Sequence, residues 1–174
     1  DQFILNQAIS LGVLDFVKNY ISSSAKIKWS NDIYISDKKV AGILIQNTLV
    51  SRNIQSCIIG VGININQTIF KSDAPNPTSL KLEMGIDFDL DELLEMLCWF
   101  IEKRYLQLMA NSFEKIKVEY LDNLYRYMED ALYQIPDGQV FRGRIIGIEE
   151  FGKLIIESKN GIQSFDTKQI KFII

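Results

Sequence analysis

Apolar residues recur every three or four positions from residue 2 to residue 21, and this period predicts an amphipathic helix. Its main stripe consists of Leu5, Ile9, Val13, Phe16 and Tyr20. Ile4, Ala8 and Leu11 form a second apolar face, so we expect the helix to be covered on most sides. The serine run at 22–24 is expected to end it.

Three strand-like runs follow with no helical segment between them. They extend from Lys26 to Trp29, from Ile33 to Val50 and from Gln55 to Ile65. Asp37-Lys38 predicts a two-residue hairpin turn inside the second run, and Ser51-Arg52-Asn53 predicts a longer turn after it. Because no helix separates these strands, the pattern favours an antiparallel meander over alternating strand–helix–strand units.

A loop and a helical region come next. Pro75 and Pro77 mark the loop. Asp89 can cap the following helix, and Glu92 three residues later completes a capping-box pattern. The expected buried stripe consists of Leu93, Leu97, Phe100 or Ile101, Tyr105 and Leu108. A second helical run, from 111 to 125, is expected to complete this layer.

Beyond Ala131 the chain changes to short alternating strands separated by glycine-containing turns. These turns are Pro136-Asp137-Gly138, Phe151-Gly152 and Lys159-Asn160-Gly161. Four or five short strands in this region predict a small β-barrel of the SH3-like kind. We therefore predict an α+β protein with two domains, residues 1–127 and residues 128–174.

The composition of the 174-residue chain, 47% hydrophobic and 24% charged, is ordinary for a globular protein. No apolar run approaches the roughly 18 residues of a membrane-spanning helix, so no membrane partner is expected. A net charge of -3 argues against a broad nucleic-acid-binding surface. Cys57 and Cys98 belong to no Cys-x-x-Cys pair, and we expect two buried, reduced thiols in a cytoplasmic protein.

The absence of histidine restricts the chemistry. It excludes Ser-His and Cys-His nucleophile pairs, a His-Glu-x-x-His zinc site and a histidine general base within this chain. Catalysis would rest on Lys, Arg, Asp, Glu, Asn, backbone dipoles or a bound Mg²⁺. This favours phosphoryl and adenylyl chemistry, and no metal site made by protein side chains alone is predicted.

The first chemically suggestive motif is Lys28-Trp29-Ser30-Asn31-Asp32-Ile33, at the end of a strand and in the turn after it. Taken alone, it has a structural explanation. Asn-Asp pairs are common in tight turns because both side chains bond their own backbone. The structural explanation of Lys28 is a solvated charge, and that of Trp29 is a core residue.

The second motif, Lys39-Val40-Ala41-Gly42-Ile43-Leu44, places a cation close to a glycine inside a strand. Such a glycine marks a bulge or the close approach of another group. Lys39 and Gly42 face opposite sides of the strand unless a bulge intervenes. A cation beside bare backbone suits a carboxylate or an α-phosphate. An exposed lysine beside a structural glycine is the alternative.

The third motif is Gly60-Val61-Gly62-Ile63-Asn64-Ile65-Asn66. It is not a dinucleotide fingerprint, because the third glycine is missing and a loop follows in place of a helix. Glycines in a strand indicate a flat surface against which a ligand can lie. Asn64 points to the same side as Gly60 and Gly62 and can bond a phosphate or base, and a plain turn role is the alternative.

In this order, the three motifs resemble successive motifs of the biotin protein ligases, and the small C-terminal barrel is also typical of that family. The resemblance spans nearly the whole chain. It implies a class II synthetase-like catalytic domain, with a mixed or antiparallel sheet backed by helices, followed by the SH3-like barrel. The family's Gly/Arg-rich loop does not precede the first motif here. We therefore expect an incomplete catalytic domain, inactive by itself.

The resemblance implies an enzyme that joins biotin to ATP and releases pyrophosphate. Biotinyl-5′-AMP then gives its biotin to a lysine of a carrier protein, such as the biotin carboxyl carrier of acetyl-CoA carboxylase. By this resemblance Lys39 and Asp32 are the catalytic residues. Lys39 would contact the biotin carboxyl and the α-phosphate. Asp32 would position and deprotonate the carrier lysine.

The same resemblance implies the binding residues. Those implied for biotin are Lys39, Gly42, Gly60 and Gly62. Those implied for ATP are Lys28, Trp29, Asn31 and Asn64, with Mg²⁺ as the counter-charge of the nucleotide. Ser30 stands where the family usually has proline, and we expect a modestly looser turn at Asn31.

Two other functions remain open from the sequence. A lipoate–protein ligase shares the Asn-Asp turn and the Lys-x-x-Gly strand, although Trp29, Ile43-Leu44 and the Gly-x-Gly-x-Asn pattern favour biotin. A non-catalytic protein-binding module, with the sheet as scaffold, is the alternative of a different class. The family resemblance also implies a possible homodimer through the central sheet.

Overall fold

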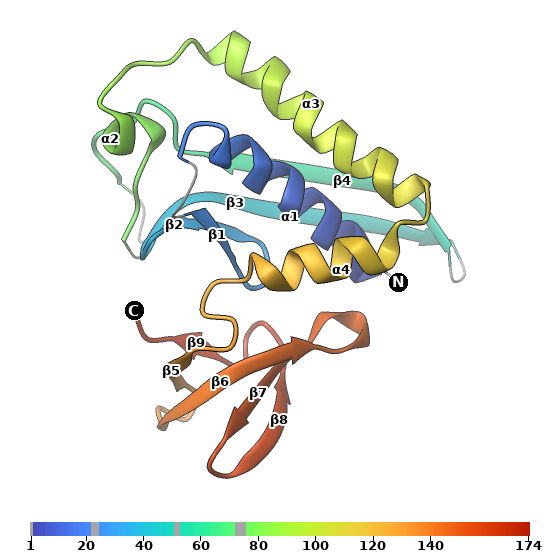
Figure 1. Ribbon diagram of the computed structural model, residues 1–174, viewed down its shortest axis with the longest axis vertical. Coiled ribbons are helices and arrows are strands. Elements are labelled where there is room, and N and C mark those ends of the chain that lie inside the picture. Colours follow the sequence, from blue (N-terminus) through green and yellow to red (C-terminus); the bar gives the residue numbers. More distant parts are fainter. Residues whose placement is uncertain (1, 22–24, 51–52, 72–75) are drawn as a thin grey trace.

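A computed structural model of the chain describes residues 2–21, 25–50, 53–71 and 76–174. Two antiparallel sheets form the framework, and helices cover one face of the first (Figure 1). The strand order is β1-β2-β3-β4 in the first sheet and β8-β7-β6-β5-β9 in the second. None of the described helices combines the length and the apolar character needed to cross a membrane.

The elements confirm the α+β class and the antiparallel meander. The first part of the chain forms α1 (Gln2–Lys18), β1 (Ala25–Lys28), β2 (Asp32–Ile35), β3 (Lys38–Val50), β4 (Asn53–Ile63), α2 (Leu80–Met84), α3 (Leu90–Met109) and α4 (Phe113–Asp122). The second part forms β5 (Asp130–Gln134), β6 (Val140–Ile148), the 3-10 turn η1 (Glu150–Gly152), β7 (Leu154–Ser158), β8 (Gly161–Phe165) and β9 (Lys171–Phe172).

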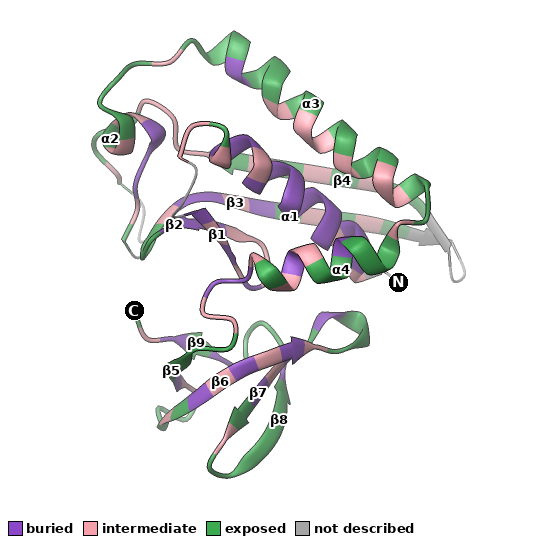
Figure 2. Ribbon diagram, viewed as in Figure 1, coloured by how far each residue is buried: buried purple, intermediate pink, exposed green. Residues whose placement is uncertain are grey.

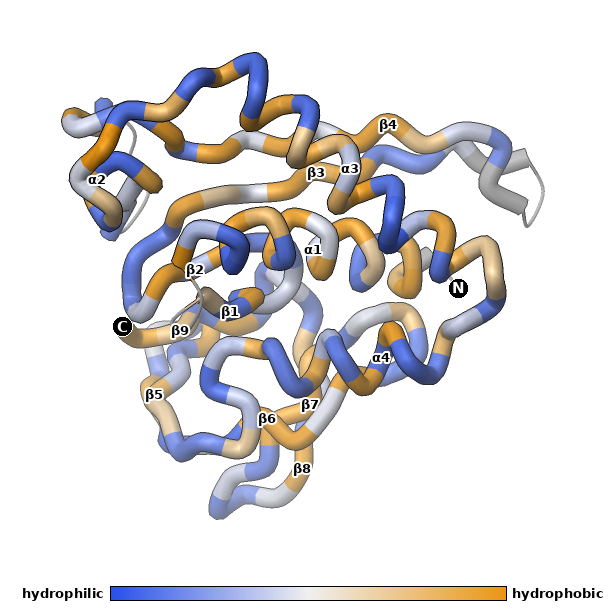
Figure 3. Tube along the Cα trace, turned by 45° about the horizontal axis from the view of Figure 1, so that its top comes forward, coloured by the Kyte–Doolittle hydropathy of each residue, from blue (hydrophilic) through white to orange (hydrophobic). Residues whose placement is uncertain are grey.

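The first helix, α1, is the centre of the core. As its two apolar faces predict, it is buried along most of its length, and even Ser10 is fully covered (Figure 2). At Gly12 a Cβ would lie 2.9 Å from the Cα of Ile101, so the absence of a side chain lets α1 and α3 cross closely. Hydrophobic positions dominate α1, whereas α4 and the second sheet mix hydrophobic and hydrophilic positions (Figure 3).

The meander forms in the predicted order, with one shift at its first tight turn. The turn occupies Ser36 and Asp37, one residue earlier than predicted, and Lys38 already pairs with Ile35. Ser36 takes a left-handed conformation with φ 52°, which is the backbone that such a turn requires. Ser51, Arg52 and Pro75, which the sequence placed in turns or loops, lie outside the described residues.

The prediction that Asp89 caps α3 is confirmed, because its side chain accepts hydrogen bonds from the backbone N–H groups of Asp91 (2.9 Å) and Glu92 (3.2 Å). Leu93 is buried, and other members of the predicted stripe pack against the core. Tyr105 was predicted to be buried and is instead 45% exposed. The reason is that it lines an open cavity between α3 and β4.

The two cysteines differ, and the expectation of two buried thiols is wrong for Cys98 and met only in part for Cys57. Cys57 in β4 is partly buried, and burial raises the pKa of its thiol. Cys98 in α3 is exposed. Both are free thiols.

The second sheet has its own apolar centre, with Tyr133, Ile145, Leu154 and Ile156 almost fully buried. A closed barrel is not shown. Strand β9 has two residues and pairs with β5 alone, so no ladder joins the edges β8 and β9 among the described strands. The structure therefore shows an open five-stranded antiparallel sheet in this region.

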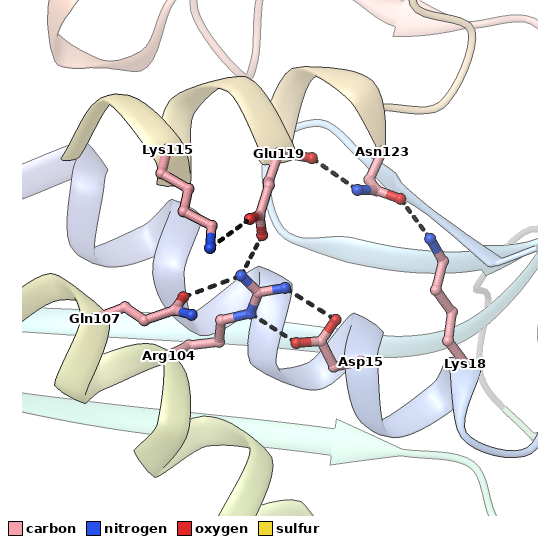
Figure 4. Close-up of polar contacts among 7 residues, drawn as sticks. All are labelled: Asp15, Lys18, Arg104, Gln107, Lys115, Glu119 and Asn123. Atoms are coloured by element: carbon pink, nitrogen blue, oxygen red, sulfur yellow. Dashed lines mark hydrogen bonds and ion pairs between the residues drawn. The ribbon is translucent and has the colours of Figure 1, made fainter. Parts of the chain in front are cut away.

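A half-buried ionic network ties three helices together (Figure 4). Arg104 of α3 donates from Nε to Asp15 Oδ2 (2.6 Å) and from Nη2 to Asp15 Oδ1 (3.1 Å), and Asp15 belongs to α1. Its Nη1 donates to Glu119 of α4. Burial alone would lower the pKa of Arg104, but the hydrogen bonds to the two carboxylates outweigh it and raise the pKa. Arg104 therefore joins the helices that cover the first sheet.

We expect Arg104→Met to lower the free energy of unfolding by about 2 kcal/mol, because two partly buried carboxylates lose their charged hydrogen bonds. Urea denaturation measures the change. Lys115→Met is the matched control, since the Lys115 side chain is 64% exposed and its Nζ lies 3.8 Å from Glu119 Oε1. The control should cost less than about 0.5 kcal/mol. Equal losses in the two variants would contradict the stabilising role given to the network.

Candidate functional site

A shallow groove of about 530 Å³ lies on the first sheet, on the face opposite the buried side chains of Ala41 and Ile43. Its lining residues are Asn31, Asp32, Lys39, Gly42, Ile43, Leu44, Gly60, Val61 and Gly62. All three sequence motifs contribute to it. The structure thus brings most of the predicted site residues together, whereas Lys28, Trp29 and Asn64 do not line the groove.

A bulge brings the charged groups to the glycine. Ile33 pairs with Ala41 and Tyr34 pairs with Lys39, so Val40 is an extra residue in β3. Val40 and Ala41 are consecutive and both buried. As a result Lys39 lies on the same side as Gly42, which strict alternation would forbid.

Lys39 and Asp32 form an ion pair directly above Gly42. Lys39 Nζ lies 2.6 Å from Asp32 Oδ1, and both side chains are only partly exposed. A Cβ at position 42 would lie 3.2 Å from Lys39 Nζ and 3.3 Å from Asp32 Oδ1. The bare backbone of Gly42 therefore leaves room for the pair, and a carboxylate or phosphate entering the groove can take the place of Asp32 beside the ammonium group.

Glycines make the rest of the groove floor. Gly42 pairs with Gly62, and Leu44 pairs with Gly60, across β3 and β4. A Cβ at Gly60 would have its nearest neighbour at 3.8 Å, and one at Gly62 at 4.0 Å, so packing does not require glycine at either position. Leu44 is 61% exposed and lines the groove. The floor is thus open backbone with one apolar side chain at its margin.

The Asn31 side chain fastens the turn to β3. Its Nδ2 donates to the Ile43 carbonyl, and its own carbonyl accepts from the Ile43 N–H at 2.9 Å. Ser30 Oγ donates to Asn31 Oδ1 at 2.9 Å, a contact that proline cannot make. The peptide bond between Trp29 and Ser30 is cis. Ser30 and Asn31 together hold the turn at one wall of the groove.

Asn64 lies just beyond the end of β4. Its backbone N–H donates to the Val40 carbonyl at 2.9 Å, and its Nδ2 donates to the Thr78 carbonyl at 2.9 Å. These bonds attach the loop before α2 to the bulged part of β3. The side-chain nitrogen of Asn64 thus supports the turn, which is the structural alternative that the sequence left open.

Lys28 lies behind the turn, where it faces aromatic rings. Its Nζ is 5.1 Å from the ring centroid of Tyr34 and 4.8 Å from that of Phe172 in β9. Burial lowers the pKa of Lys28, and the positive charges of Lys39 and Arg126 lower it further against the opposing effect of Asp32. Lys28 therefore interacts electrostatically with Asp32 and Lys39 of the groove, although it does not line the groove.

Trp29 is 6% exposed, and its Nε1 donates to the Gly152 carbonyl at 2.9 Å. Trp29 is thus packed as a core residue, which is the structural explanation that the sequence offered for it. Residues that the sequence reasoning did not assign to the site also contribute, notably Val61 in the floor and Tyr120, whose hydroxyl donates to the Ser30 carbonyl at 2.8 Å. The alternation of β4 places the Val61 side chain on the core side, so the sequence pattern does not indicate Val61 as a groove residue. No local pattern indicates a contact from α4 either.

The groove contains one carboxylate, Asp32, and one ammonium group, Lys39. Nowhere in the described ranges do three or more cysteine and carboxylate side chains gather as a metal site would require. The arrangement can bind an anionic group at Lys39 and an apolar or flat group along the glycines.

Comparison with known proteins gives a consistent result. A sequence profile of the biotin/lipoate A/B protein ligase family matches residues 2–64, and one of the biotin protein ligase C terminal domain matches residues 134–167. The bifunctional ligase/repressor BirA of Bacillus subtilis is 29% identical over 167 residues, which are 93% of this chain and 50% of that protein. The biotin–[acetyl-CoA-carboxylase] ligase of Paracoccus denitrificans is 27% identical over 150 residues, with 84% and 62% covered.

The chain spans about half the length of the BirA proteins it matches. A solved structure with the same fold is the biotin protein ligase from Aquifex aeolicus in complex with biotin and ATP. Its TM-score is 0.78 at 23% identity, and 99% of this chain and 72% of that chain are covered. The two profiles match in order, the second is that of biotin ligases, and a lipoate ligase is not favoured. The chain belongs to the biotin protein ligase family.

Proposed function

We propose that the protein is a biotin–[acetyl-CoA-carboxylase] ligase, which forms biotinyl-5′-AMP from biotin and ATP and transfers biotin to a lysine of a carrier protein. The observation that carries the proposal is the Lys39–Asp32 ion pair above Gly42, at the head of a glycine floor. A cation, a carboxylate and exposed backbone in one groove are what adenylation of a carboxylic acid and aminolysis of the product require.

In the first step Lys39 and the floor act on biotin. The bicyclic ring and aliphatic chain of biotin lie along Gly42, Gly60 and Gly62, beside the exposed side chain of Leu44. Its carboxylate exchanges with Asp32 as the partner of Lys39. A carboxylate oxygen attacks the α-phosphorus of ATP, the bond to the β-phosphate breaks, and pyrophosphate leaves. Lys39 stabilises the negative charge that develops on the α-phosphoryl oxygens.

The wall formed by the turn takes the nucleotide. Asn31 binds its phosphate side from the groove wall. Asn64, Lys28 and Trp29, which do not line the groove, support the nucleotide site from behind that wall. Mg²⁺ bound to ATP would supply the counter-charge of the phosphates. Asp32 is the one carboxylate in the groove, and magnesium sites commonly combine one or two carboxylates with substrate phosphates, so the residues fit an ion held mainly by the nucleotide.

In the second step Asp32 receives the carrier lysine. The neutral amine attacks the acyl carbon of biotinyl-5′-AMP, an amide forms and AMP leaves. Asp32 orients the amine and accepts the proton that it loses. The carrier is a biotin carboxyl carrier domain, which must present its lysine to the open side of the groove.

The domain organisation is part of the proposal. Residues 1–127 form the ligase part and residues 128–174 a separate module, which the position of the second profile match supports. We interpret the open five-stranded sheet as an SH3-like module whose edges β8 and β9 do not pair. We also propose that the protein forms a homodimer through β4, whose outer edge pairs with no described strand. The proposed location is the cytoplasm.

The decisive measurement is pyrophosphate release by the complete protein with ATP and either biotin or lipoate. We expect release with biotin alone, and we expect Lys39→Ala to reduce it at least about 100-fold, because a charge-stabilising donor is lost. Lys38→Ala is the control, since the side chain of Lys38 is 56% exposed and pairs with Glu83 away from the groove. Release with lipoate instead of biotin, or with neither, would contradict the proposal.

A second prediction concerns the floor. Gly60→Ala and Gly62→Ala should each raise the KM for biotin about 10-fold, because a methyl group occupies the space taken by the ligand. The KM for ATP and the unfolding free energy should stay close to wild type, since the methyl group meets no protein atom within 3.8 Å. Gly147→Ala, in the second sheet with its nearest contact at 3.5 Å, is the control. An unchanged KM for biotin would remove these glycines from the biotin site.

A further inference from the structure

The turn that carries Asn31 and Asp32 is held from its far side by α4. Tyr120 is fully buried, and its hydroxyl donates to the Ser30 carbonyl at 2.8 Å across 90 positions of sequence. Burial raises the pKa of Tyr120 well above its ordinary value, so the hydroxyl keeps its proton for this bond at any working pH. Removing the hydroxyl would leave the partly buried Ser30 carbonyl without this donor.

A second contact comes from the open C-terminal sheet. Trp29 Nε1 donates to the Gly152 carbonyl, in the η1 turn between β6 and β7. Gly152 has φ +90°, and a Cβ there would lie 2.3 Å from Phe3 Cδ2. Only glycine lets this turn approach α1 so closely while its carbonyl meets the indole N–H. The position of Trp29 therefore depends on the C-terminal sheet.

The strand leading into the turn is fixed in the same way. The Ile27 N–H donates to the Asn123 carbonyl at 2.9 Å, and the Tyr125 N–H donates to the Ile27 carbonyl at 2.7 Å. The ammonium group of Lys28 lies over the ring of Phe172. Four consecutive residues, 27–30, thus each contact a residue that follows position 119. On the other side of the groove, the described atoms nearest to a Cβ added at Gly60 or Gly62 belong to β3 instead.

We propose that Tyr120 and Trp29 are positioning residues, through which α4 and the C-terminal sheet set the place of Asn31 and Asp32 in the groove. The expected effect on catalysis rests on the proposed function, in which the turn forms the nucleotide side of the groove and the glycine floor forms the biotin side. Loosening the turn must then weaken the use of ATP and leave biotin binding unchanged. A purely structural role would lower the amount of folded enzyme and move neither KM.

The test is steady-state adenylation by the complete protein carrying Tyr120→Phe or Trp29→Phe. We expect each variant to raise the KM for ATP about 5-fold, the effect of one lost hydrogen bond, with the KM for biotin unchanged. Tyr133→Phe is the matched control, because Tyr133 is also fully buried but its hydroxyl has no hydrogen-bond partner within the part of the chain that the structure describes. Unchanged KM values in both test variants, or equal shifts for the two substrates, would overturn the proposal.

A second readout does not need activity. The Ile43 N–H donates to the Asn31 carbonyl, so amide hydrogen exchange at Ile43 reports whether the turn stays in place. Exchange there should be faster in Tyr120→Phe than in Tyr133→Phe, with the Met128 amide, bonded to the Ile145 carbonyl, unchanged in both. If the wild type adenylates no biotin, the proposed function fails, and exchange still decides the positioning role. Equal exchange at Ile43 in the two variants would refute it.

Discussion

The bulge at Val40 is the constraint on which the candidate site depends. Two consecutive buried residues in β3 shift the side-chain alternation by one position, so Lys39 and Gly42 share a face. The ion pair with Asp32, the space above Gly42 and the groove itself all follow from that shift. The bulge is also tied down from outside the sheet, because the Val40 carbonyl accepts from the Asn64 N–H.

The two faces of the first sheet have separate tasks. The inner face packs on α1, which the Arg104 network joins to α3 and α4. The outer face stays open over β3 and β4 at the groove. Residues of α4 and of the C-terminal sheet bond to the turn that follows β1. The turn with Asn31 and Asp32 is therefore held in place by contacts, whereas the glycine floor leaves space for a ligand.

Local patterns predicted the elements well, because α1, the meander and the capped start of α3 each depend on neighbours in sequence. The three motifs also identified most groove residues. What failed depends on distant packing. The exposure of Tyr105 and Cys98 reflects what covers α3, and the open edges of the second sheet reflect the short β9. The bonds of Trp29 and Tyr120 span 123 and 90 positions, which no periodicity reports.

The floor glycines also have an evolutionary consequence. Because a side chain at Gly60 or Gly62 would meet no crowded atoms, folding exerts little selection on these positions. Under the function proposed above, the bound ligand exerts nearly all of it. A single methyl group can therefore redefine which acid fits while the scaffold stays intact. Within this sheet, substrate choice can drift over generations by small steps, independently of the residues that perform the chemistry.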